Sequence, residues 1–192
     1  NITINTGSTT TVIGNIDAVT DGLPLTVASG GTLKGTAGLF RELLINGAIS
    51  PGNSVQWFVT ADETWNPGGS YVWEINDATG TLGGGSNSLA SGWDFLNVIG
   101  NITVAATSGN PFTIKATSLS GATPGNMANF DKDVAKTWTI ASAEAPQTAN
   151  FGWSAVIRRF TELLVLAAFA ARRWESRNFS LSSLSLIHIS EP

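Results

Sequence analysis

The side chains best suited to recognise a ligand in this sequence are tryptophans. Trp57, Trp65 and Trp73 recur at intervals of eight residues, in a chain that holds seven tryptophans. Indole faces presented side by side on a β scaffold would stack on the apolar faces of sugar rings. Alternatively, these side chains fill the core or cover an open sheet end, where a large apolar group blocks edge pairing. The sequence leaves both roles open and favours the structural one.

Acidic side chains are the second candidate, because a glycosidase needs two carboxylates about 5 to 10 Å apart across a sugar. The acids form three local pairs, Asp62 with Glu63, Glu74 with Asp77, and Asp131 with Asp133. These pairs are scattered along the chain, with no histidine or arginine beside them. The third pair lacks the glycine and distal glutamate of an EF-hand calcium loop. We therefore predict no catalytic residues, no metal site and no cofactor, and expect that the protein is not an enzyme.

The composition excludes several other kinds of chemistry. The 192 residues suffice for one domain with a buried core, yet only 12% of them are charged, against a usual value of about 25%. A net charge of −4 argues against nucleic-acid binding, which depends on lysine and arginine neutralising phosphates. Without cysteine there is no disulfide, thiolate metal site or cysteine nucleophile. The one histidine, His188, lies close to the C-terminus.

The elements that would position these side chains are short β-strands. Up to residue 150 the chain alternates brief runs of β-forming residues with Gly, Asn, Asp, Ser or Pro, as in Leu43-Leu44-Ile45 before Asn46-Gly47. Strands this short, with turns every few residues, suit a solenoid in which each coil adds one strand to a parallel stack. Asn1-Ile2-Thr3 returns as Asn101-Ile102-Thr103, although no strict period is visible. The prediction is an all-β parallel solenoid, with a β-sandwich-like arrangement as the alternative.

Two stretches of this region carry a family resemblance. Leu33-Lys34-Gly35-Thr36, followed by Gly47-Ala48-Ile49-Ser50-Pro51-Gly52-Asn53-Ser54, resembles the autotransporter-associated β-strand repeat of bacterial surface proteins. Residues 69–77 and 92–98 are similar to the region that follows that turn in the family, and the resemblance extends over about residues 30–145. It implies a right-handed parallel β-helix that belongs to an exported passenger region, displayed at the surface of a Gram-negative-type cell.

The chain changes character after Asn150. Half of its ten cations, all arginine, lie in residues 151–192, and Ala155 to Trp174 contains no glycine or proline. These residues predict a helical tail over 151–183, whose apolar run from Leu163 to Ala171 is too short to span a bilayer, since about 20 residues are needed. Residues 184–192 resemble the conceptual translation of a transposase adapter used in sequencing libraries.

That adapter, together with a start at Asn1 that lacks Met and a signal peptide, suggests a fragment from an environmental sequencing read. A frame shift near residue 150 would explain the arginines. We therefore expect a solenoid passenger-like region over residues 1–150, followed by segments of non-native origin over 151–183 and 184–192.

The functional expectation is a non-catalytic, exported protein with a structural or adhesive role at the outer surface of a Gram-negative-type bacterium. Its partners would be surface glycans or other cell-surface components, with no nucleic acid and no membrane span. The alternative is a carbohydrate-binding or carbohydrate-processing β-helix that uses Trp57, Trp65 and Trp73 with the scattered acids.

Overall fold

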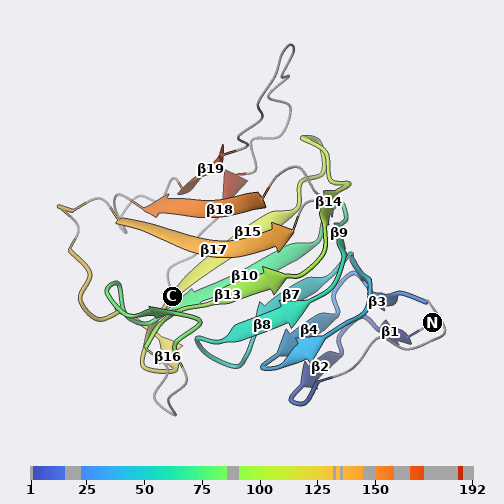
Figure 1. The fold of residues 1–192 in the computed structure, drawn as a ribbon, viewed down its shortest axis with the longest axis horizontal. Helices are drawn as coiled ribbons and strands as arrows, with labels where there is room; N and C mark the ends of the chain where they lie inside the picture. Colours follow the sequence, from blue (N-terminus) through green and yellow to red (C-terminus); the bar gives the residue numbers. More distant parts are fainter. Residues whose placement is uncertain are drawn as a thin grey trace.

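Short β-strands form three mostly parallel sheets in the computed structural model (Figure 1). The structure describes residues 2–15, 23–85, 91–131, 133–134, 136–144, 150–157, 165–170 and 186–187. Sheet A contains β1 (Ile2–Ile4), β3 (Leu25–Val27), β6 (Leu43–Ile45), β9 (Glu63–Trp65) and β14 (Ile102–Val104). Sheet B contains β2 (Thr9–Val12), β4 (Thr32–Gly35), β7 (Ala48–Pro51), β10 (Ser70–Ile75), β11 (Thr81–Leu82), β12 (Gly92–Trp93), β15 (Thr113–Ser120) and β16 (Thr123–Pro124). Sheet C contains β5 (Gly38–Leu39), β8 (Trp57–Thr60), β13 (Phe95–Val98), β17 (Lys136–Glu144), β18 (Asn150–Ile157), β19 (Val165–Ala170) and β20 (Leu186–Ile187).

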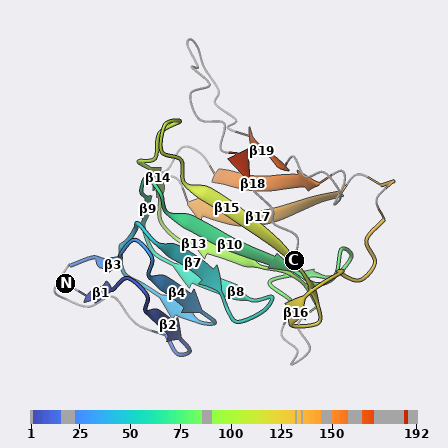
Figure 2. The same cartoon turned by 180° about the vertical axis from the view of Figure 1, so that it is seen from behind.

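The chain visits the three sheets in a repeating order, which confirms the predicted all-β, solenoid-like arrangement. It runs through β3, β4 and β5, then β6, β7 and β8, and each new strand pairs in parallel with its counterpart in the preceding coil. The next two coils follow the same order, through β9, β10 and β13 and then β14, β15 and β17. Figure 2 shows the same stack from behind, with the N-terminal strands at one end. Sandwiches are built from antiparallel sheets, so this parallel order sets the fold apart from the alternative.

The core lies between the three sheets and is built from columns of side chains in register. Ile4, Val27, Ile45 and Trp65 follow one another in sheet A, and all four are buried. Between the inward positions, each sheet A strand directs one residue outward, as expected for side chains that alternate across a strand. These outward residues are Thr3, Thr26, Leu44, Thr64 and Thr103. Stacking therefore gives an apolar interior column and an uncharged outer column that is mostly threonine.

A glycine stands at the corner between sheets A and B in three successive coils. Gly31, Gly47 and Gly69 directly precede β4, β7 and β10. A Cβ atom on Gly47 would lie 2.3 Å from the carbonyl oxygen of Ala28 and 2.4 Å from that of Gly31, both in the preceding coil. At Gly31 and Gly69 the nearest carbonyl oxygens would be at 2.7 and 2.6 Å. The corner thus brings backbones of adjacent coils closer together than any side chain permits.

The turn that carries the family resemblance lies at another corner, between β7 and β8. Gly52 has a φ of +64° there, a left-handed conformation that glycine adopts without steric cost. The Asn53 side chain accepts a hydrogen bond from Lys34 Nζ at 3.2 Å, which ties the turn to the preceding coil. The Pro-Gly-Asn-Ser segment therefore has a local structural role in joining two sheets.

The helical tail expected over residues 151–183 stays a prediction, because the structure describes only residues 151–157 and 165–170 of it, as strands. Residues 150–157 and 165–170 form β18 and β19, which continue sheet C by antiparallel pairing after β17. A short apolar run has no period that separates a helix from a buried strand, and the edge of β17 offers hydrogen-bonding partners to a strand. Within 184–192 only β20 at 186–187 is described, so the adapter segment, with His188, lies mainly outside the described residues.

Candidate functional site

The three tryptophans expected to form a row do not share a surface. Trp65 and Trp73 are buried, with 3% and 1% of their surface exposed. Trp65 stacks on Phe112 with ring centroids 4.4 Å apart, and Trp73 Nε1 donates a hydrogen bond to the main-chain oxygen of Asp94 at 2.8 Å. The glycan-stacking role is therefore excluded for these two residues, which fill the core as the alternative predicted. The period of eight alternates between sheets A, B and C and does not follow one outer face.

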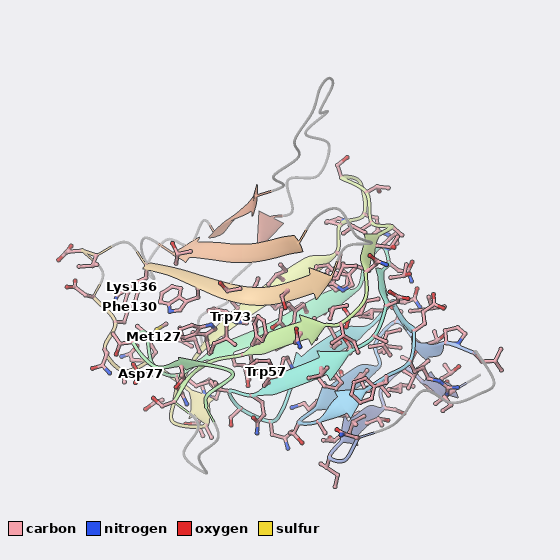
Figure 3. The ribbon with its side chains drawn as sticks, viewed as in Figure 1. Trp57, Trp73, Asp77, Met127, Phe130 and Lys136 are labelled. Atoms are coloured by element: carbon pink, nitrogen blue, oxygen red, sulfur yellow. The ribbon has the colours of Figure 1, made fainter. Side chains whose placement is uncertain are left out.

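Trp57 differs from the other two because 43% of its surface is exposed. Phe95, its register partner on β13, meets it edge to face, with ring centroids 5.1 Å apart and an interplanar angle of 79°. On the same outward side of β13, Asn97 accepts a hydrogen bond from Ser142 Oγ at 2.9 Å. Figure 3 shows Trp57 beside the β8 ribbon, apart from Asp77, Met127 and Phe130. An indole held by a second aromatic ring, with an amide nearby, can offer an apolar face and a hydrogen-bond donor to one ligand.

The Asp62–Glu63 pair is divided between solvent and core. Asp62 is exposed, and its Oδ1 accepts a hydrogen bond of 2.7 Å from the backbone N–H of Asn101 in the next coil. Glu63 is buried, and its carboxyl group bonds to Thr60 and Trp65. Because β9 begins at Glu63, the two neighbours face opposite sides of the coil and do not act on one substrate.

Asp77 joins three loop segments at the end of β10, and it does not form a pair with Glu74. Its Oδ1 accepts hydrogen bonds from Thr79 and from Asn129 Nδ2, and its Oδ2 accepts one from Ser91 Oγ at 2.8 Å. Burial alone would raise the pKa of Asp77, but the hydrogen bonds from Asn129, Thr79 and Ser91 outweigh it and lower that pKa to about 2. Figure 3 shows Asp77 close to Met127 and Phe130, in agreement with its bridge to Ala128. The contacts of Asp77 are those of a residue that holds neighbouring loops together.

The low pKa of Asp77 predicts a stability that depends on acid pH. A carboxylate whose pKa is lower in the folded state stabilises the fold above about pH 4, and this contribution is lost as the pH falls toward 2. In Asp77→Asn the side-chain oxygen still accepts, and the amide nitrogen can donate to Ser91, so the fold should be kept. Thermal unfolding measured at pH 5 and pH 2 should show a smaller decrease in Tm for the variant than for the wild type. Equal decreases would contradict this role.

The third acidic pair forms a turn. Asp131 Oδ1 accepts a hydrogen bond of 2.9 Å from the backbone N–H of Asp133, and Lys132 between them lies outside the described residues. Over the part of the chain that the structure describes, no three or more Asp, Glu, His or Cys side chains gather at a metal-binding distance. The three pairs are thus not brought together.

Two buried carboxyl groups, those of Asp94 and Glu63, were not singled out from the sequence as core residues. The Asp94 carboxyl accepts hydrogen bonds from the backbone N–H groups of Gln56 at 2.8 Å and Glu74 at 2.9 Å. Burial raises the pKa of Asp94 well above its ordinary value, although these two donors act in the opposite direction. Their position in the sequence could have indicated burial, because both acids stand beside short β-forming runs whose inward residues are otherwise apolar. Asp94 joins β10 to the residue preceding β8.

Comparison with known proteins gives no match to a family model, a curated protein or a solved structure. Among the described residues, no helix is long and apolar enough to cross a membrane. The features of the described chain that bear on function are therefore the geometry of the coils and the surface around Trp57.

Proposed function

We propose that this chain is a non-catalytic part of an exported surface protein, in which stacked coils space or present an adhesive surface. The supporting observation is the outer column of sheet A, where threonine occupies four of five stacked positions, Thr3, Thr26, Thr64 and Thr103, with Leu44 between. Each coil contacts its neighbours along the stack, so an array of this kind lengthens by adding coils without needing a new core. A right-handed β-helix passenger at the surface of a Gram-negative-type bacterium is the form of the proposal that the family resemblance favours.

Five acids of the described region have structural roles that support a non-catalytic function. Glu63 and Asp94 are enclosed in the core, Asp62 and Asp77 are engaged with neighbouring loops, and Asp131 closes a turn. Each of these carboxylates has a structural partner, and none is paired with another across an open surface. Cell-surface components, glycans among them, are the proposed partners.

Limited proteolysis and circular dichroism test the proposed architecture. A stack of parallel coils should resist protease over the described solenoid and give a β-type far-UV spectrum. Immobilised protein should retain bacterial or host-type cells on a surface without consuming any substrate from a panel of glycosides and esters. A helical or coil spectrum, or turnover of one of these substrates, would overturn the proposal.

A second candidate, carbohydrate binding without processing, is favoured by one observation, the exposed indole of Trp57 packed on Phe95. Replacing Trp57 by alanine should weaken binding of a responsive polysaccharide about tenfold, the upper range expected for one aromatic stacking contact. Tryptophan fluorescence titrated with a polysaccharide panel measures the effect. Ile99→Ala is the matched control, because Ile99 is 42% exposed and follows β13. If no polysaccharide gives a saturable response, or if both variants lose it equally, Trp57 is not a glycan contact.

A further inference from the structure

At one corner of the core, polar side chains occupy register positions that the neighbouring coils fill with aliphatic residues, and Arg41, between β5 and β6 of the preceding coil, is buried as well. At the junction of sheets C and A, the residues at these register positions are Leu39, Leu43 and Ile45 in one coil and Val98, Ile102 and Val104 two coils on. Between them, at the same register, stand Thr60, Glu63 and Trp65. A carboxyl group thus occupies a stacking position that its neighbours in register fill with leucine and isoleucine.

The Glu63 carboxyl is completely enclosed and has neutral partners. Its Oε1 accepts a hydrogen bond from Thr60 Oγ1 at 2.7 Å, and its Oε2 accepts one from Trp65 Nε1 at 2.7 Å. Leu43 of β6 and Ile102 of β14 stack on either side of it. From β10, Tyr71 interacts with it electrostatically, and the tyrosine hydroxyl is engaged with the Ile140 oxygen at 2.9 Å. The groups directed at the carboxyl from these strands are therefore a hydroxyl, an indole and aliphatic carbons.

This geometry suits an uncharged carboxylic acid better than a carboxylate. A buried charge requires a partner of opposite charge or a set of strong donors, whereas a neutral acid needs only ordinary hydrogen bonds. The protonated group can donate to Thr60 Oγ1, whose hydroxyl hydrogen rotates, while still accepting from Trp65 Nε1. The same two partners therefore satisfy the neutral form without movement of the backbone.

We propose that Glu63 makes the stability of the central coils proton-dependent. Through this group, the free energy of unfolding of the solenoid is larger in mildly acidic surroundings and smaller in alkaline ones. Burial is the main cause that raises the pKa of Glu63 from 4.5 to about 7, and the hydrogen bonds from Thr60 and Trp65 only partly oppose it. The unfolded chain releases this proton near pH 4.5 and the folded chain near pH 7, so the stabilisation that Glu63 contributes is greatest below pH 4.5. It decreases as the pH rises through 7 and is then constant.

Glu63→Gln is the informative variant, because glutamine has the same shape and keeps an acceptor for Trp65 Nε1 but cannot ionise. The unfolding equilibrium constant, measured with urea from pH 4 to pH 9, should rise for the wild type relative to the variant by roughly a hundredfold between the two ends. Asp94 and Glu74, whose pKa values burial also raises, are present in both proteins, so their contribution cancels in the comparison. Asp62→Asn is the matched control on the exposed neighbour, and its comparison with the wild type should show no such rise.

A spectroscopic readout separates protonation from a merely structural role. The Trp65 Nε1–H resonance, assigned by its loss in Trp65→Phe, should shift with a midpoint near pH 7 in the wild type and stay constant in Glu63→Gln. If Glu63→Gln proves unfolded, this titration in the wild type still decides the question. A resonance that does not move between pH 5 and pH 9, or a wild type and variant with parallel stability profiles, would overturn the proposal. Neither outcome depends on whether the protein is adhesive.

Discussion

Replacing Gly47 by alanine is expected to destabilise the protein by about 3 kcal/mol or more, because the added methyl group has no space. Its Cβ would lie 2.3 Å from the Ala28 oxygen and 2.4 Å from the Gly31 oxygen. The Gly31 oxygen also accepts the hydrogen bond from Ala48 N, and the Gly47 oxygen accepts one from Ser70 N. Relief of the clash would separate the coils on both sides of Gly47. The substitution would therefore also weaken the backbone hydrogen bonds between these coils.

The matched control for Gly47→Ala is Gly109→Ala, at the turn between β14 and β15. A Cβ at Gly109 meets nothing within 4 Å, so this variant should unfold within about 1 kcal/mol of the wild type. Urea unfolding at neutral pH, followed by tryptophan fluorescence and circular dichroism, gives both free energies. If the two variants were equally stable, close approach of the coils at this corner could not be a determinant of the fold.

Replacing Asp94 by alanine should cost about 3 kcal/mol, since it leaves two partly buried backbone N–H groups without an acceptor. Those groups belong to Gln56 and Glu74, in two different coils, so the loss weakens the attachment of β10 to the start of β8. Asp94→Asn should lose less, because its remaining oxygen can still accept one of the two bonds. Equilibrium unfolding at constant pH measures all three proteins.

Asp62→Ala provides the comparison for Asp94. Asp62 also accepts a backbone hydrogen bond, from Asn101 at 2.7 Å, but it does so in contact with water, which can replace it. Its loss should therefore cost under about 1 kcal/mol. A cost for Asp94→Ala no larger than that for Asp62→Ala would mean that the buried carboxylate does not hold the two coils together.

The strands and their parallel stacking could be predicted from the sequence because each strand combines β-forming residues with an adjacent turn former. The period could not, because connections of very different length interrupt it. Only residues 36 and 37 separate β4 from β5, whereas the path from β10 to β13 includes β11 and β12. The glycines at positions 31, 47 and 69 mark the repeat better than the apolar runs do, because each stands at the same corner, where a side chain would clash with the adjacent coil. The sequence after residue 150 predicts a helix because it contains good helix formers and no glycine or proline over Ala155 to Trp174. Such a run does not show whether a strand edge lies beside it in space.

The candidate site was less predictable than the fold. The spacing of Trp57, Trp65 and Trp73 along the sequence does not determine how exposed their side chains are. Their exposure depends on the sheet to which each residue belongs and on the side of the strand that it faces. Glu63 follows an exposed aspartate, and its place beside a short β-forming run does not by itself show which side of the strand it faces. Its position became evident only from the register of β9 with β6, which aligns it with Leu43. The surroundings of each candidate residue thus depend more on such alignments than on residue type.

The unequal connections between sheets B and C have an evolutionary consequence. After β10 and after β15 the chain adds the short strands β11, β12 and β16 to sheet B before it enters sheet C in register with the preceding coil. Lengthening such a loop costs only about 0.6 kcal/mol for each doubling, so it leaves the ladders nearly unaffected. New segments can therefore be grafted at this corner and varied rapidly while the scaffold stays constant.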